Sequence, residues 1–172
     1  MDCRISYLSP QGHARELAYS FRRILPSRTP IVDLSQQFST DGMLHLVGFE
    51  YSDISLDTIP VPVQHFLNQL HGKDVLLFAT SPVCVDTKIH DKLDRHMLSK
   101  IPADNKYHGL YLCQGEVYLT ILEDTAKMAD QHGNSDAKDL LRQYRKGKGH
   151  PNREDIRKGY RFISATIPLE NY

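Results

Sequence analysis

The chain has few cysteines, no long hydrophobic run and none of the common catalytic fingerprints. Its three cysteines, Cys3, Cys84 and Cys113, have no CxxC spacing, which argues against a disulfide framework or a zinc site and favours reduced thiols. No segment approaches the roughly 20 apolar residues that a membrane-spanning helix needs, and the first residues do not resemble a secretion signal. P-loop, GxSxG, GxGxxG and HExxH motifs are missing. We therefore expect a cytoplasmic protein with no membrane contact, no bound metal and no catalytic residue that can be named.

Basic residues are missing from a long internal stretch. Between Thr29 and Gly72 there is no Lys or Arg, although acidic residues occur there, while basic residues predominate between Arg142 and Arg161. The two signs balance over the chain, with 21 Lys and Arg against 21 Asp and Glu. This balance argues against a nucleic-acid-binding protein, and we expect the basic stretch to be a solvated face. A length of 172 residues predicts a single domain over 1–172.

Short apolar runs alternate with stretches of helical periodicity along the whole chain. Strands are predicted over 4–8, 31–32, 44–49, 74–79 and 107–113, and helices over 13–25, 63–70, 89–98, 119–128 and 137–144, with a last helix capped by Asn152. The run over 74–79 is apolar throughout, as is typical of a strand buried on both faces of a parallel sheet. The pattern predicts a doubly wound α/β fold with a five-stranded parallel sheet in the order 2-1-3-4-5. In this order a ligand crevice lies at the carboxyl ends of strands one and three, so we expect contacts from the loops after residues 8, 49 and 79.

The first of these loops carries the most specific motif. Ser9, Gln11, Gly12, His13 and Ala14 stand between the first strand and the first helix, where free backbone N–H groups and the helix dipole favour a phosphate. The simpler interpretation is a turn that leads into a helix. The run ISYLSPQGHARELA resembles the phosphate-loop signature of the flavodoxin family, in which a small hydroxyl residue and a glycine precede the helix. It departs from that signature where Ala14 replaces a usual Thr and His13 a usual Asn. A protonated His13 or the Gln11 amide could compensate for the lost hydroxyl.

Two further stretches resemble flavodoxins. The stretch 46–81 resembles the family's segment from the third strand through the fourth, and the closing runs GLYLCQGEV and GHPNREDIRKGYRFI resemble members with an extended C-terminal half. The resemblance implies a flavodoxin-like three-layer α/β/α sandwich in which the loop after strand three borders a flavin ring. The residues implied there are Phe49, Glu50, Tyr51 and Ser52. Phe49 or Tyr51 could stack on the ring. The simpler interpretation makes Phe49 a core residue and Tyr51 a partly exposed loop residue, and we favour it for Phe49.

The loop after strand four supplies the remaining candidates. Thr80, Ser81, Pro82, Val83 and Cys84 would offer backbone amides and hydroxyls to the ring edge, although the loop has no glycine. Cys84 is interpreted as a small apolar filler rather than a reactive thiol.

The resemblance implies non-covalent FMN and electron transfer to a redox partner protein, in a monomer or homodimer. The acidic residues near the second loop would lower the flavin potential and attract a basic partner. The equally simple interpretation is that Asp53 and Asp57 only solvate a surface loop. One alternative is an FMN-dependent NAD(P)H or quinone-type oxidoreductase that acts on a small acceptor. A second alternative is a module of the same fold that has lost FMN and binds proteins.

Overall fold

The computed structural model describes residues 3–132 and 135–171 and contains the predicted parallel sheet. Its strands are β1 (Cys3–Tyr7), β2 (Ile31–Asp33), β3 (Leu44–Glu50), β4 (Asp74–Ser81) and β5 (Lys106–Gln114). They pair in the order β2-β1-β3-β4-β5, and every pairing is parallel. The predicted strand order is therefore confirmed, and the carboxyl ends of β1 and β3 meet at one edge of the sheet.

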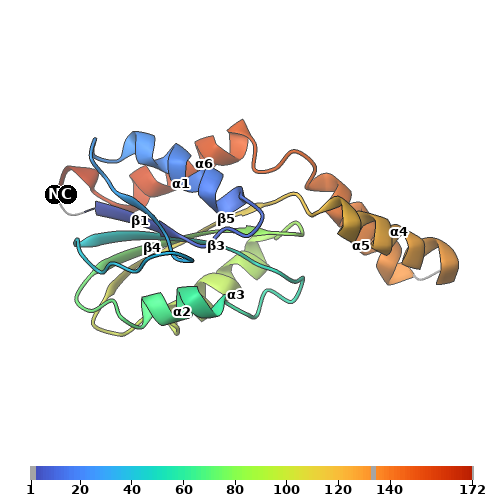
Figure 1. Cartoon of the computed structure of the whole chain (residues 1–172), viewed down its shortest axis with the longest axis horizontal. Helices are drawn as coiled ribbons and strands as arrows, with labels where there is room; N and C mark the ends of the chain where they lie inside the picture. Colours follow the sequence, from blue (N-terminus) through green and yellow to red (C-terminus); the bar gives the residue numbers. More distant parts are fainter. Residues whose placement is uncertain (1–2, 133–134, 172) are drawn as a thin grey trace.

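Helices cover both faces of the sheet, as Figure 1 shows. The helical elements are α1 (His13–Phe21), η1 (Arg22–Ile24), α2 (Val61–Leu67), α3 (Thr87–Leu98), α4 (Leu119–His132), α5 (Ser135–Lys146), α6 (Arg153–Thr166) and η2 (Leu169–Asn171). Helices α1 and α6 lie on one face of the sheet, and α2 and α3 lie on the other (Figure 1). Helices α4 and α5 pack against each other and project beyond the carboxyl ends of the strands (Figure 1). No helix in the described ranges has both the length and the apolar character that a membrane crossing requires.

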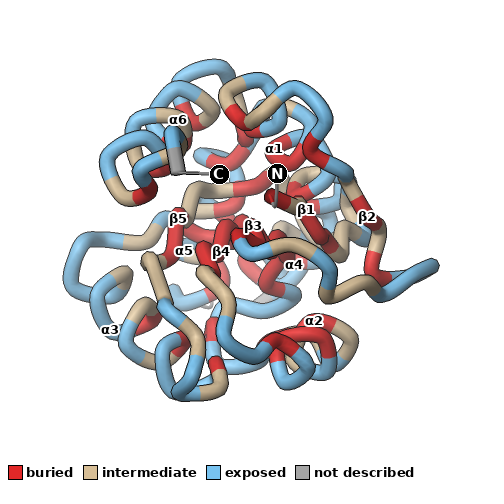
Figure 2. Tube along the Cα trace, turned by 90° about the vertical axis from the view of Figure 1, so that its left-hand side faces the viewer, coloured by how far each residue is buried: buried red, intermediate tan, exposed pale blue. Residues whose placement is uncertain are grey.

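The central strand β3 separates two cores because side chains alternate across a sheet. Leu44 and Leu46 belong to the core beneath α1 and α6, whereas Val47 and Phe49 belong to the core against α2 and α3. All seven residues of β3 are buried, and Figure 2 shows the sheet as the buried centre of the molecule. The alternation places Glu50, the last residue of β3, on the α1 side.

Gly48 lies on this same side of β3 and is required there by close packing. A Cβ atom at this position would lie 2.2 Å from the ring of Phe78 on the neighbouring strand. The aromatic ring therefore occupies the space that any larger residue would need. The tight packing of β3 against β4 holds the end of β3, and with it Glu50, close to the first turn of α1.

Element boundaries differ from the sequence predictions in a few places. Strand β4 continues to Ser81, so Thr80 and Ser81 lie in the strand and not in the loop that follows it. The first helix ends at Phe21 and tightens into the 3₁₀ turn η1. The cap predicted at Asn152 is confirmed: its side chain accepts from the backbone of Glu154 and Asp155, and Asp155 completes a capping box.

Candidate functional site

The loop between β1 and α1 surrounds an anion that belongs to the chain itself. We call residues 9–14 the anion-binding loop. Gly12 forms the N-cap of α1 with φ +91°, a left-handed conformation that glycine adopts without strain. This conformation turns successive backbone N–H groups toward one point, and the carboxylate of Glu50 lies at that point.

Four donors of the anion-binding loop converge on Glu50. Its Oε1 accepts from Ser9 Oγ at 2.6 Å, from the backbone of His13 at 2.8 Å and from that of Ala14 at 3.1 Å. Its Oε2 accepts from the backbone of Gln11 at 2.8 Å. The Ser9 hydroxyl itself accepts from the backbone of Arg15 at 3.0 Å, so its proton points to the carboxylate. Glu50 is only 5% exposed, and these bonds together with the α1 dipole stabilise its buried charge.

The segment after β5 closes over the anion-binding loop. We call residues 115–118 the strap. The backbone oxygen of Glu116 accepts from His13 Nε2 at 2.7 Å, and the Tyr118 hydroxyl donates to the backbone oxygen of Pro10 at 2.9 Å. Gly115 leaves no room for a side chain, because a Cβ there would lie 2.9 Å from the His13 ring. A cavity of only about 10 Å³ remains between the loop, the strap and the end of β4.

These contacts show how the loop residues singled out from the sequence are used. Gln11 contributes its backbone N–H to Glu50, and Ala14 contributes its backbone N–H although it lacks a hydroxyl. The His13 ring is bonded to the strap and not to the carboxylate of Glu50. Its Nε2 carries the proton, because the carbonyl oxygen of Glu116 can only accept.

The aromatic residues predicted near a flavin ring face the core. Phe49 is completely buried, as expected, and Tyr51 packs against it with ring centroids 5.2 Å apart. The simpler interpretation of Tyr51 as a partly exposed residue does not hold: it is 2% exposed, because the alternation of β3 continues beyond the strand end. Its hydroxyl has no hydrogen-bond partner among the described residues, and burial raises the pKa of this phenol. Only Ser52 of the predicted group is exposed at the surface.

The end of β4 and its loop are mostly buried. Thr80 and Ser81 are buried, and the Ser81 hydroxyl donates to the backbone oxygen of Val83 at 2.8 Å, so it is already satisfied. Pro82 is also buried, and its backbone oxygen accepts from the Gln114 side chain. The interpretation of Cys84 as an apolar filler is wrong, because this cysteine is exposed and its thiol donates to Gln114 Oε1 at 3.1 Å.

An open cavity of about 440 Å³ adjoins these loops. It lies between residues 54–57 after β3 and residues 83–85 after β4, with Leu93 of α3 and Leu140 of α5 in its wall. Ile54 and Ile89 at its border are exposed apolar residues. Its size falls in the range of small-molecule sites, and two of its walls are the loops predicted to hold a ligand.

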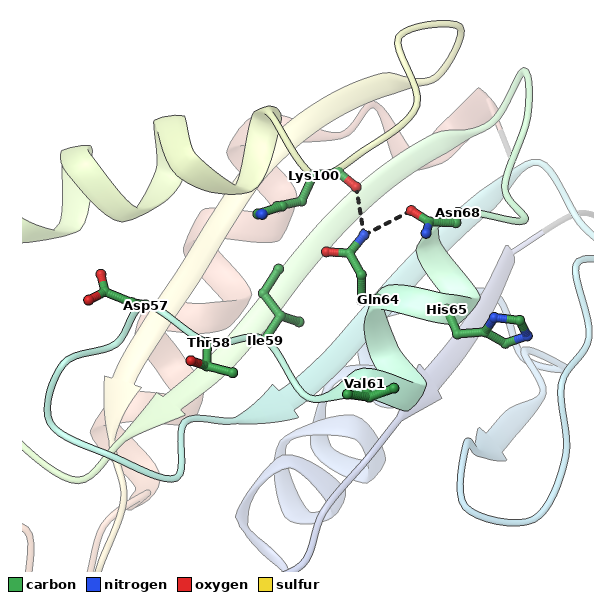
Figure 3. Close-up of a pocket in the computed structure, with 8 residues that line it drawn as sticks. All are labelled: Asp57, Thr58, Ile59, Val61, Gln64, His65, Asn68 and Lys100. Carbon is green, nitrogen blue, oxygen red and sulfur yellow. Dashed lines mark hydrogen bonds between the residues drawn. The ribbon is translucent and has the colours of Figure 1, made fainter.

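A second hollow of about 450 Å³ lies on the α2 side of the molecule (Figure 3). The Gln64 amide in this hollow is already paired, since it donates to Asn68 at 2.9 Å and to the backbone oxygen of Lys100 at 3.0 Å (Figure 3). None of its lining residues belongs to the anion-binding loop or the strap. In the part of the chain that the structure describes, no cluster of three His, Cys, Asp or Glu side chains is arranged to hold a metal ion.

Two features of the site were not predicted. The run GLYLCQGEV reaches into the strap but gave no contact for it, and only the arrival of β5 at the same edge of the sheet brings Glu116 to His13. Glu50 was expected beside a flavin ring, whereas it lies inside the anion-binding loop. The alternation over 44–50 carries the signal for its direction, since it places Glu50 on the same side as Leu44 and Leu46.

Comparisons with known proteins identify the family of this chain. A solved structure described as a flavodoxin from the domain Archaea matches with a TM-score of 0.45 and 12% sequence identity, covering 86% of this chain and 99% of that one. The comparison with curated proteins finds no match. Residues 4–164 match the family described as Flavodoxin domain, a range that includes the anion-binding loop, the open cavity and the strap. This chain belongs to the flavodoxin domain family.

Proposed function

We propose that this domain binds FMN non-covalently and carries electrons between partner proteins. The observation that carries the proposal is the convergence of four donors of the anion-binding loop on one buried carboxylate. That arrangement is suited to an anion with several acceptor oxygens, as a phosphate monoester has.

The residues present fit the phosphate of FMN in their chemistry. Glu50 serves as a stand-in anion, and a phosphate would accept the same bonds from Ser9, Gln11, His13 and Ala14. A single hydroxyl, that of Ser9, takes part, since Ala14 offers only its backbone. Binding at this place requires that Glu50 leaves the loop.

The open cavity is the place we propose for the flavin ring. Its volume of about 440 Å³ and its walls of Leu56, Val83 and Leu93 would shield one side of an aromatic system from water. FMN supplies, when bound, a ring that accepts and releases one or two electrons. The contribution of this chain is to bind and orient it, so no acid or base has to be assigned.

We infer electron carriage rather than self-sufficient turnover because the sequence shows no NAD(P)H-binding fingerprint. The exposed carboxylates Asp53 and Asp57 lie on the loop at the open cavity and favour a partner with a basic surface. Steady turnover of NAD(P)H and a small acceptor by the purified protein alone would contradict a pure carrier.

The direct test is a titration of the purified chain with FMN and, in parallel, with riboflavin. Both have the same ring, and only FMN has the phosphate. We expect quenching of FMN fluorescence with saturation, and binding of riboflavin weaker by roughly tenfold or more, because the loop donors act on the phosphate alone. A chain that does not quench FMN at saturating concentrations would overturn the proposal.

A second candidate is a domain of the same fold that binds proteins without a flavin. It is favoured by one observation: Glu50 already satisfies the loop donors, and the strap leaves a cavity of about 10 Å³ beside them. The same titration separates the two candidates.

A further inference from the structure

We propose that Glu50 is an internal competitor for phosphate: its carboxylate holds the anion-binding loop in the flavin-free chain and must rotate out when the phosphate of a ligand binds. The inference deepens the proposed function and rests on it for the identity of the ligand. It concerns the affinity of the site for a phosphate-bearing ligand and the conformation of the anion-binding loop in the flavin-free chain.

The competition follows from the number of bonds. Both carboxylate oxygens are used, and the four donors that a phosphate needs are the four that Glu50 holds. A carboxylate and a phosphate that share these donors would repel each other, because little water screens their charges there. The free volume of about 10 Å³ also leaves no room for a second anion beside Glu50. Carboxylate and phosphate therefore exclude one another.

The exchange needs no movement of the strand that carries Glu50. The backbone of Glu50 is held by the pairing of β3 with β4, where Glu50 lies opposite Thr80, and the next residue, Tyr51, donates to the backbone oxygen of Thr80 at 2.9 Å. On the other side, Leu8 donates to the backbone oxygen of Gly48 at 2.9 Å. The strand thus stays in place while the flexible Glu side chain changes rotamer.

The strap sets the route of the exchange. Its bonds from His13 to the backbone of Glu116 and from Tyr118 to the backbone of Pro10 close the surface above the loop. The Glu116 side chain is itself bonded, since its Oε2 accepts from the backbone of Gly149 at 2.9 Å. We expect the strap to open while Glu50 leaves, so that flavin binding by the wild-type chain is slow as well as weak.

The first experiment tests the loop without any flavin. Purified Glu50→Gln and Glu50→Ala chains are melted in a series of inorganic phosphate concentrations, beside the wild type. The matched control is Glu16→Gln, which removes one negative charge from an exposed position in the first turn of α1 but no bond to the loop. We expect phosphate to raise the melting temperature of both Glu50 variants by several degrees, and to leave the wild type and Glu16→Gln unchanged.

The second experiment measures FMN and riboflavin affinity of the same four chains by fluorescence quenching. We expect Glu50→Gln to bind FMN about tenfold more tightly than the wild type, with riboflavin affinity unchanged and Glu16→Gln close to the wild type. The Gln side chain keeps one acceptor but turns an N–H₂ group toward the donors, so it holds the loop less well. If Glu50→Ala does not fold, the phosphate melts and the two titrations of Glu50→Gln test the competition without it.

The results separate this inference from the proposed function. If no chain binds FMN but the Glu50 variants respond to phosphate, the competition stands and the FMN proposal is wrong. If the wild type binds FMN as tightly as Glu50→Gln and no variant gains a response to phosphate, the competition is wrong and the FMN proposal stands. A phosphate response of equal size in all four chains also overturns the competition.

Discussion

The two ends of the crevice at the carboxyl edge of the sheet are in opposite states. At the closed end, Glu50 fills the anion-binding loop and a cavity of about 10 Å³ remains, whereas the open end holds a cavity of about 440 Å³ with exposed apolar residues at its border. At the closed end the hydrogen bonds join the loop to a carboxylate on another strand, whereas at the open end Asp53 accepts from Ser55 and Leu56 of its own loop. A ligand that uses both ends therefore meets a ready surface at one end and an occupied one at the other.

The largest effect we expect is a loss of stability when the closed end loses its anion. Glu50→Ala leaves four donors without their acceptor, one of them buried and three partly buried, and at roughly 1 kcal/mol for each the free energy of unfolding falls by about 4 kcal/mol. Ile54→Ala at the open end is the control, and it should cost less than about 0.5 kcal/mol because Ile54 is half exposed. Urea unfolding in phosphate-free buffer measures both. Equal losses of unfolding free energy in Glu50→Ala and Ile54→Ala would show that Glu50 stabilises the closed end no more than an exposed side chain stabilises the open end.

A comparison of the two ends at low pH has to allow for His45, at the opposite end of β3. Burial lowers the pKa of this imidazole from 6.5 to about 4, and Lys73 and Arg4 add to the shift. The unfolded chain therefore takes up the proton first, so stability is complete above pH 6.5 and falls toward pH 4, by about 3 kcal/mol in all.

His45→Gln should remove this slope, while Glu50→Gln should keep it, because it leaves His45 unchanged. Chemical unfolding at a series of pH values measures both variants. If the free energy of unfolding of the wild-type chain stayed constant as the pH is lowered from 6.5 to 4, His45 would take up its proton in the folded state as readily as in the unfolded state.

A smaller loss is expected at Gly12, which gives the anion-binding loop its shape. Its φ of +91° is strained for any other residue, although nothing lies within 4 Å of a Cβ atom there. Gly12→Ala should therefore lower the free energy of unfolding by about 1 to 2 kcal/mol and weaken FMN more than riboflavin. Urea unfolding and the two titrations measure these effects. An FMN affinity equal to that of the wild type would place the phosphate elsewhere.

The smallest effect we expect concerns the open end, where the labelling rate of the Cys84 thiol reports whether the cavity is covered. Cys84 is exposed, whereas burial raises the pKa of Cys3 to about 11 and that of Cys113 to about 12. An aromatic disulfide reagent at mildly alkaline pH should thus label one thiol rapidly, and Cys84→Ser should abolish this fast phase. Saturating FMN should slow the labelling several-fold. An unchanged rate would mean that the ring does not cover the open end.

Sequence patterns predicted much of this molecule because local periodicity and burial agree in it. The apolar run over 74–79 is the core of β4, and Asn152 caps α6 as its position before an acidic pair indicated. The turn from β1 into α1 was also predicted, because the turn-forming run Ser-Pro-Gln-Gly over 9–12 separates an apolar run from a helical pattern.

The errors occur where a residue's surroundings come from distant segments. Tyr51 was interpreted either as a stacking partner of the ring or as a partly exposed residue, but it is buried on the inward face of β3 and packs on Phe49. Cys84 was expected to fill space, but it lies at the border of a cavity whose far wall is α5. In both cases burial depends on elements that are remote in the sequence.

The sequence by itself determined the succession of strands and helices, the strand order of the sheet and the place of the turn at residues 9–12. Periodicity and backbone sterics are local, so they can be read from neighbouring residues. Only the tertiary structure decided that Glu50 reaches the anion-binding loop and that the strap closes it. These contacts depend on the register of parallel strands, which brings residues 36 to 103 positions apart to one edge of the sheet.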